Sequence, residues 1–341
     1  MYLTRRHMGG KLLASVVLLA LGHSCINEDL SDCGTEFKIH YEVKLENNLQ
    51  TELDANLKSV EEKKLGNRLK EELSQVFTNK VRDFDLRFYV TDSSLLHQEK
   101  YLFDPPKDNL TKTLYLPIMD YQHIAMANNV DEHNVSLEYG DRAEKTAWVQ
   151  KVSPTDTLES YEHGLFSGRL KMEVKGVSET FFVNMYMQNA AAAVVINPGT
   201  VKVDKVQGTI SHLANGFMLR DSVYFYHDNT VIRAKELKET GSNLRCLYGV
   251  GLPSRDFSYV RATEVDEDSE GDIWLFRVQV VLADGKVVPS ILRVKSPLKA
   301  GHLKLILVNL NEDGGMTTVS SEVGASADLE WRPGGEFNPE L

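Results

Sequence analysis

Cysteine is scarce in this chain of 341 residues, and its placement is uneven. There are three cysteines, Cys25, Cys33 and Cys246, and two of them lie eight residues apart near the N-terminus. So few cysteines exclude a disulfide-rich scaffold. Cys33 and Cys246 could pair in an exported protein. Sequence cannot supply the geometry of such a bond, so whether the two cysteines pair stays open here, and we favour free thiols over a disulfide.

Positive charge is also in deficit. The chain has 38 Lys and Arg against 49 Asp and Glu, a formal net charge of −11. The first 24 residues contain three basic and no acidic residues, so the remainder carries −14. A phosphate backbone would repel a body this acidic, and we therefore expect no nucleic-acid partner.

Catalytic and metal-binding motifs are missing as well. The stretch GLFSG (164–168) misplaces the serine of a nucleophile elbow, and H-E-x-x-H, Walker and Cys-x-x-Cys motifs do not occur. The ten histidines are scattered. DEDSEGD (266–272) resembles the start of a calcium loop, but Arg277 occupies the position that needs a bidentate Glu, so we interpret it as an acidic loop. We expect no enzyme activity, no cofactor and no metal.

Long apolar runs are absent after the N-terminal segment. Arg5, Arg6 and Lys11 precede an apolar core, Leu12 to Leu21, which fits a signal sequence and is too short to span a bilayer. The later stretch 181–196 is interrupted by polar residues. Gly22, His23 and Ser24 lead into Cys25, and this resembles a bacterial lipobox. Residues 1–24 would then be a lipoprotein signal peptide, and Cys25 the lipidation site. The alternative is ordinary cleavage near Ser24, with Cys25 as a free thiol.

The dominant pattern in the remaining chain has period two, which is typical of half-buried strands. Apolar and polar residues alternate over 37–45 and 84–90, and again over 114–119, 121–127, 168–174, 181–187 and 302–310. Asp284-Gly285 separates two such runs and predicts a hairpin. One region differs: five leucines and Phe77 recur at helical spacing over 53–77 and predict an amphipathic helix packed on a sheet.

These patterns predict a mainly β protein with two antiparallel β-sandwich domains. The polar, turn-rich stretch 153–164 marks the expected boundary. We therefore predict a tether over 25–33, an N-terminal sandwich with the helix over 34–160, a C-terminal sandwich over 165–331, and an irregular tail over 332–341.

Four stretches stand out in order along the chain: INEDLSDC (26–33) after the lipobox cysteine, DLRFYVTDSSLL (85–96), LYLPIMDYQHIAMAN (114–128) and HGLFSG (163–168). Together they are similar to the FimB-like family of fimbrial anchor lipoproteins from anaerobic Gram-negative bacteria. The resemblance implies two transthyretin-like sandwiches and a place at the base of a type V pilus. It also implies lipid attachment to the outer membrane and partners among the pilin subunits. Glu28 and Asp29 resemble the surface-export signal of such lipoproteins.

The resemblance further implies a way to tell an anchor from a stalk subunit. Stalk subunits of type V pili lose their lipid and first strand when a protease cuts, typically after arginine. No arginine occurs between Cys25 and Asn67. We therefore expect the first strand, 36–45, to stay in place, so that the subunit terminates growth of the filament.

Two questions stay open at this point. A surface glycan-binding lipoprotein would also be rich in β-structure, and it would need an exposed aromatic platform, for which Trp148, Trp274 and Trp331 lie far apart. The segment 316–331 could donate a strand to a neighbouring subunit, or it could belong to the protein's own sheet.

Overall fold

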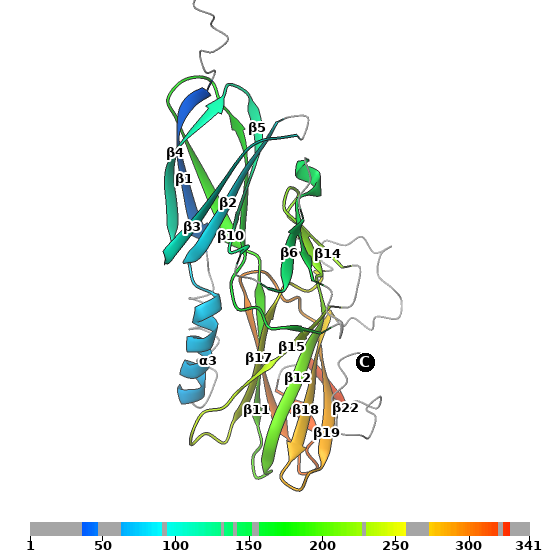
Figure 1. Cartoon of the computed structure of the whole chain (residues 1–341). Coiled ribbons are helices and arrows are strands. Elements are labelled where there is room, and N and C mark those ends of the chain that lie inside the picture. Colours follow the sequence, from blue (N-terminus) through cyan, green and yellow to red (C-terminus); the bar gives the residue numbers. More distant parts are fainter. Residues whose placement is uncertain are drawn as a thin grey trace, which may run out of the picture.

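Two β-sandwiches stacked end to end form the molecule in this computed structural model, with one helix alongside (Figure 1). The mainly β fold predicted from the alternating pattern is confirmed. The structure describes residues 36–46, 63–90, 94–130, 133–138, 142–151, 157–226, 230–256 and 273–319, and the backbone of 323–327.

A seven-stranded sheet forms the first sandwich, in the order β3-β2-β5-β9-β10-β1-β4. The sheet folds over on itself, so that its two end strands, β3 and β4, come together. Their contact is visible at Lys112 on β4, whose Nζ lies 4.7 Å from the ring centroid of Tyr101 on β3. The core lies inside the fold. The strands are β1 (Glu36–Glu46), β2 (Val81–Val90), β3 (Leu95–Lys107), β4 (Asn109–Pro117), β5 (Asp120–Ala127), β9 (Phe166–Glu173) and β10 (Glu179–Met187).

The second sandwich has two separate sheets that share an apolar core. The five-stranded sheet runs β16-β17-β11-β20-β21, and the six-stranded sheet runs β22-β19-β18-β12-β15-β8. The strands of the first are β11 (Ala190–Asn197), β16 (Lys235–Leu237), β17 (Arg245–Gly251), β20 (Leu303–Leu310) and β21 (Met316–Thr318). Those of the second are β8 (Thr157–Glu159), β12 (Val203–Leu213), β15 (Thr230–Arg233), β18 (Trp274–Leu282), β19 (Val287–Val294) and β22 (Val323–Ala327).

A small fourth sheet covers part of the outer face of the first sandwich. The Tyr89 hydroxyl on β2 bonds the Thr146 hydroxyl at 2.7 Å, and the Arg169 guanidinium on β9 donates to the Arg220 carbonyl at 2.7 Å. The cover explains why a charged residue on this face, Arg87, is fully buried beside Asp85 at 3.0 Å. The elements are β6 (Val135–Glu138), the 3₁₀-helix η1 (Ala143–Lys145), β7 (Ala147–Gln150), β13 (Gly216–Met218) and β14 (Val223–Phe225), and the sheet runs β14-β13-β7-β6.

The predicted helix is present as α3 (Lys63–Val76), and the part of the prediction over 53–62 lies outside the described residues. Its leucines are buried, but against the second sandwich: the Tyr248 hydroxyl on β17 donates to the Glu72 carboxylate at 3.1 Å (Figure 1). The sequence pattern predicts this helix within the N-terminal sandwich, whereas it packs on the second. An apolar stripe packs on any complementary sheet face, and beside Tyr248 strand β11 offers the small residue Ala193, which lets a helix approach closely.

The chain changes sandwich differently from what the turn-rich stretch 153–164 suggests. β8 pairs with β15 in the second sandwich, but β9 and β10 then return to complete the first sheet beside β5 and β1. Strands of the second sandwich follow from Ala190 on, but β13 and β14 return once more to the small sheet that covers the first sandwich. Alternation shows that a segment is a strand, and it carries no information on which sheet that strand joins.

The hairpin predicted at Asp284-Gly285 joins β18 to β19, with Gly285 at a φ of 84° as such a turn requires. At the C-terminal end, β21 pairs with β20 and β22 pairs with β19. Of the segment proposed as a donated strand, Met316–Thr318 and Val323–Ala327 are therefore used by the protein's own sheets, and 320–322 and 328–331 lie outside the described residues. We do not retain the donation hypothesis.

Gly164, at the start of the HGLFSG motif, lies where three elements meet. A Cβ added there would lie 2.7 Å from the Val76 carbonyl oxygen at the end of α3 and 2.7 Å from the Met187 methyl group. Because the carbonyl is backbone, the helix end would have to shift.

We expect Gly164→Ala to lower the free energy of unfolding by about 1–3 kcal/mol, measured by urea denaturation. Gly315→Ala is the control, since the nearest atom to its added Cβ is the flexible Asp313 carboxylate at 3.2 Å. Equal stability of the two variants would show that the junction tolerates the shift.

Candidate functional site

The predicted lipidation site, Cys25, lies outside the described residues, and so do Glu28, Asp29 and Cys33. The first described residue is Glu36, which is also the first residue of β1. The candidate site is therefore described from β1 and the residues that hold it, which we call the β1 seat: β10, β4 and the core side chains beneath them.

β1 is an interior strand of the first sheet (Figure 1). It runs parallel to β10 over eight residue pairs, from Ile39↔Glu179 to Glu46↔Tyr186. On its other side it runs antiparallel to β4 over nine pairs, from Glu36↔Pro117 to Lys44↔Asn109. Removing β1 would leave a strand-wide gap between β10 and β4 and two unpaired strand edges.

Alternation along β1 divides it into a buried and an exposed face. Ile39, Tyr41, Val43 and Leu45 are each 3% exposed or less. Full burial of one such apolar side chain stabilises by about 1.5–3 kcal/mol, so together they rival the 5–15 kcal/mol net stability of a typical domain. On the exposed face, His40 pairs with Glu42 at 3.0 Å and Lys44 with Glu46 at 2.8 Å.

A polar contact ties the middle of β1 to the opposite layer of the core. The Tyr41 hydroxyl and His123 Nε2 on β5 are 2.5 Å apart, and His123 Nδ1 lies 2.9 Å from the Arg87 carbonyl. That carbonyl can only accept, so Nδ1 carries the proton and Tyr41 donates to Nε2. Burial lowers the pKa of His123 to about 4, against the raising effect of the Arg87 carbonyl, and burial raises the pKa of Tyr41. Both side chains are neutral at physiological pH.

The other candidate residues lie apart from the β1 seat. Cys246 on β17 is a buried free thiol whose pKa burial raises to about 12, so it is unreactive at neutral pH. Trp148 and Trp274 are fully buried, and Trp331 lies outside the described residues, as does the acidic loop 266–272. Within the described ranges, no group of three or more His, Cys, Asp or Glu side chains is placed to hold a metal ion.

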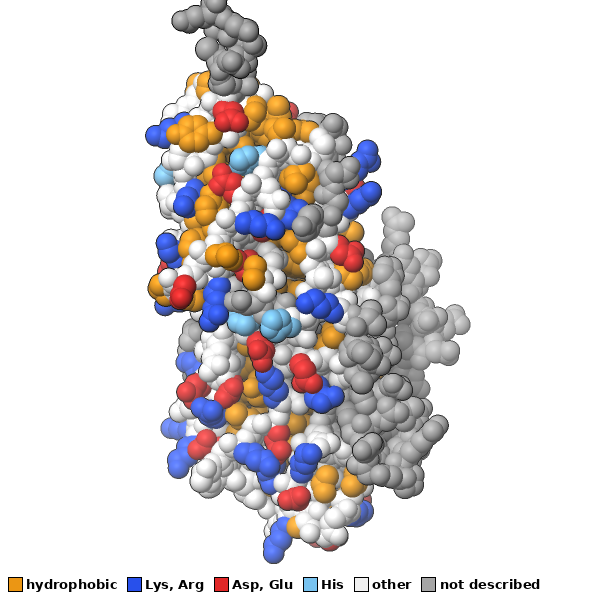
Figure 2. Space-filling view, viewed as in Figure 1, with side chains coloured by type: hydrophobic (Ala, Val, Ile, Leu, Met, Phe, Trp, Pro, Cys, Tyr) orange, Lys and Arg blue, Asp and Glu red, His pale blue; other side chains and the backbone are white. Residues whose placement is uncertain are grey.

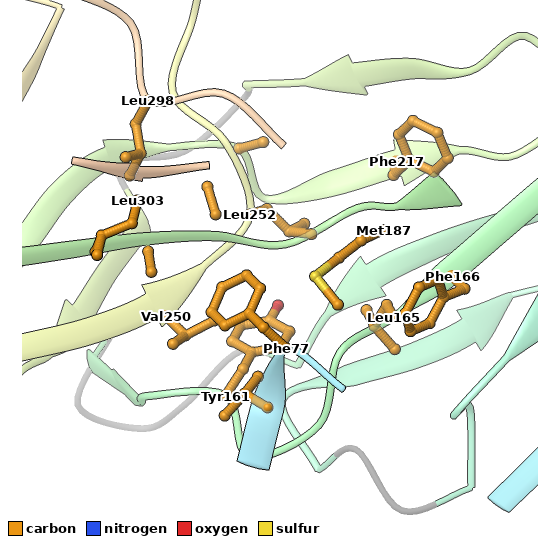
Figure 3. Close-up of a cluster of buried hydrophobic side chains, with 14 of the residues drawn as sticks. Phe77, Tyr161, Leu165, Phe166, Met187, Phe217, Val250, Leu252, Leu298 and Leu303 are labelled. Atoms are coloured by element: carbon orange, nitrogen blue, oxygen red, sulfur yellow. The ribbon is translucent and has the colours of Figure 1, made fainter. Parts of the chain in front are cut away.

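An apolar cluster joins the two sandwiches and the end of α3 (Figure 3). Phe77 follows the helix, Tyr161 lies in the crossover before β9, and Met187 and Val250 end β10 and β17, and all four are buried. Figure 3 shows these side chains converging from the separate elements. The cluster fixes the first sandwich, which contains the β1 seat, against the second. Sequence periodicity places Phe77 and Met187 on apolar faces, but it does not indicate that they meet.

The outer surface carries charges of both signs. Figure 2 shows basic and acidic side chains interspersed over the visible face, with apolar side chains more frequent on the first sandwich. No helix in the described part of the chain is long and apolar enough to cross a membrane.

We expect Tyr41→Phe to lower the free energy of unfolding by about 1–3 kcal/mol, because it leaves the buried His123 Nε2 without a donor. Tyr186→Phe, with the residue 56% exposed on β10, is the matched control and should change little. Chemical denaturation measures both. A Tyr41→Phe variant as stable as the control would mean that the buried contact contributes nothing.

We also expect a pH dependence from His123. Its pKa is about 4 in the folded protein and near 6.5, its ordinary value, when unfolded. Between these values the unfolded chain binds the extra proton, so stability falls as pH drops from about 6.5 to about 4, by about 3 kcal/mol in all. His123→Gln should remove this contribution. A stability profile between pH 7 and pH 4 that is identical in the two proteins would contradict the assignment.

No protein-family model matches the chain, and no curated protein matches it in sequence. Solved structures do match in fold. A candidate polysaccharide-binding protein from Bacteroides thetaiotaomicron has a TM-score of 0.52 at 12% identity, covering 85% of this chain and 98% of that one. A candidate adhesin from Bacteroides ovatus has a TM-score of 0.51 at 10% identity, covering 86% and 96%.

The fimbrial anchor protein Mfa2 from Porphyromonas gingivalis also matches, with a TM-score of 0.48 at 10% identity, covering 84% of this chain and 97% of that one. At these identities the first two matches show a shared fold. The structural neighbours of this chain thus include candidate adhesins and a fimbrial anchor protein.

Proposed function

We propose that this chain is a non-enzymatic structural protein of the cell surface, a fimbrial subunit held at the outer membrane by a lipid on Cys25. The lipobox-like N-terminus and the FimB-like motifs support the attachment, and the fold shared with candidate adhesins agrees with a surface role. The observation that carries the proposal is the position of β1, which starts 11 residues after Cys25 and lies inside the first sheet.

This position suits a load-bearing anchor. A pull on the lipid would reach the fold at Glu36, at one end of β1, and would act along the strand. Ladders of backbone hydrogen bonds to β10 and β4 would then be sheared together, instead of opening one after another. The buried side chains of β1 and the Tyr41–His123 contact would resist the same displacement.

The β1 seat also supports the proposed termination of filament growth. A groove already filled by the protein's own strand cannot accept a strand from a neighbour. Lys38 is paired with β4, and Lys44 is paired with both β4 and β10. A protease cannot bind the backbone of either lysine while the sheet is folded. The pilin subunits would then attach elsewhere on the molecule.

A second candidate function is glycan binding at the cell surface. The buried tryptophans do not supply an aromatic platform, but the outer face of the first sheet exposes three aromatic rings. Tyr115 on β4 and Phe182 and Tyr186 on β10 are 55%, 63% and 56% exposed. Register places all three on the face opposite the core. The matched structure described as a candidate polysaccharide-binding protein is a further reason to keep this function.

We expect Cys25→Ala to release the protein from the membrane fraction, because the acyl chains would be its attachment. Metabolic labelling with a fatty-acid analogue, followed by fractionation, measures this, and Cys33→Ala is the matched control that should keep both label and membrane association. A wild-type protein that stays unlabelled yet fractionates with membranes would contradict lipid anchoring.

Mass spectrometry of the mature protein tests the anchor role separately: an N-terminus beyond residue 45 would indicate a stalk subunit.

A further inference from the structure

A polar cavity lies where the two sandwiches and the end of α3 meet. Its volume is about 540 Å³, within the range of roughly 300–1,000 Å³ that is usual for small-molecule sites. Three parts of the molecule line it. The first sandwich contributes Lys80 and Arg82, the helix end contributes Glu72, and the crossover and second sandwich contribute Glu162, Lys235 and Tyr248.

The walls of the cavity are held in place before any ligand arrives. The Asn128 side chain accepts from the Arg82 backbone N–H at 3.0 Å and donates to the Gly164 carbonyl at 2.8 Å, which ties the first sandwich to the crossover. The Ser160 hydroxyl accepts from the Val250 N–H at 2.9 Å, which ties the crossover to β17. The buried Phe77 and Tyr161 belong to the apolar cluster that joins the sandwiches. A preformed site loses less entropy when it binds.

Charge is divided across the cavity. Both carboxylates already have partners: Glu72 is 2.8 Å from Arg68 and accepts from the Tyr248 hydroxyl, and Glu162 is 3.5 Å from Lys235. Lys80 and Arg82, two residues apart at the start of β2, add positive charge on the side of the first sandwich. With Lys235, the lining has three cations against two carboxylates, a slight positive excess that is opposite in sign to the net charge of −11 of the chain.

The remaining lining groups are hydroxyls and amides. Ser74, Gln75 and Thr78 on the helix end offer both donors and acceptors. Such groups suit a ligand that carries several hydroxyls, and the two carboxylates can each accept a hydrogen bond from a ligand hydroxyl. A guanidinium and an ammonium suit a carboxylate or phosphate at one end of that ligand.

We propose that this junction cavity binds an acidic saccharide, a sugar that carries a carboxylate or phosphate group. Lys80 and Arg82 hold the anionic group, and Glu72, Glu162 and the neighbouring hydroxyl side chains bind the sugar hydroxyls. A bound sugar touches both sandwiches and the helix, so it also stabilises their relative placement. The site is distinct from the β1 seat, and the inference does not require that the chain anchors a fimbria.

The test is isothermal titration of the full chain, purified in detergent, with four probes. Trigalacturonic acid carries carboxylates, glucose 6-phosphate carries a phosphate, maltotriose is neutral, and inorganic phosphate is an anion without hydroxyl-bearing carbons. We expect binding of at least one of the two acidic sugars, which also tells the two anionic groups apart. Maltotriose and inorganic phosphate should bind at least about tenfold more weakly.

Two variants locate the site. Lys80→Met with Arg82→Met should weaken binding of the acidic sugar at least about tenfold. The control, Lys202→Met with Lys205→Met, removes two exposed lysines at the start of β12, outside the cavity lining, and should leave the affinity within about twofold. Glu162→Gln keeps the shape of the side chain and removes its charge. It should weaken binding of the acidic sugar, and it should not raise the affinity for inorganic phosphate to that for the sugar.

The outcomes separate cleanly. Failure of both acidic sugars to bind, or equal affinity in the cavity and control variants, overturns the site. Inorganic phosphate binding as tightly as glucose 6-phosphate overturns the saccharide and leaves a simple anion site. If the Lys80/Arg82 variant loses its cooperative thermal unfolding, Glu162→Gln decides, and unchanged affinity there overturns the proposal. None of these results depends on where the protein resides in the cell, so they are independent of the membrane-release test.

Discussion

The insertion of β1 between β10 and β4 is the constraint on which the rest of the first sandwich depends. It joins residues 36–46 to residues 179–187, more than 130 positions away, and to the edge strand β4. Four buried side chains and the Tyr41–His123 contact make β1 part of the core and not an appendage. A tether at the N-terminal end of this strand is therefore connected directly to the core of the domain.

The path of the chain couples the two sandwiches. It enters the second at β8, returns for β9 and β10, and leaves again for β11 and β12. It then visits the small sheet that covers the first sandwich at β13 and β14. Each crossing places buried side chains at the junction, and α3 adds Phe77 from a third direction. Several segments of the chain cross between the sandwiches and pack in one apolar cluster. Relative motion of the sandwiches would therefore expose that cluster to water. The polar cavity lies at the edge of the same junction, where the side chains of the two sandwiches and of α3 leave a space between them.

The proposed functions depend on different parts of the surface. The load-bearing role needs β1 in its seat and the lipid on Cys25, whereas sugar binding needs the junction cavity. The exposed aromatic rings of β4 and β10 lie on yet another surface, the face of the first sheet opposite the core. A surface protein can combine a fixed base with a binding site because these demands fall on separate residues.

Local patterns in the sequence determined the secondary structure. Alternation identified β1, β2, β10, β18 and β20, Asp284-Gly285 identified a hairpin, and leucine spacing identified α3, since each depends only on nearby residues. The lipid on Cys25 stays a prediction. The tertiary structure alone decided which sheet each strand joins, which surface buries the helix, and that β21 and β22 complete the protein's own sheets. It alone brought Tyr41 to His123 and assembled the junction cavity from three distant segments. Period-two and period-3.6 patterns specify which face of an element is apolar, and they leave its partner undetermined.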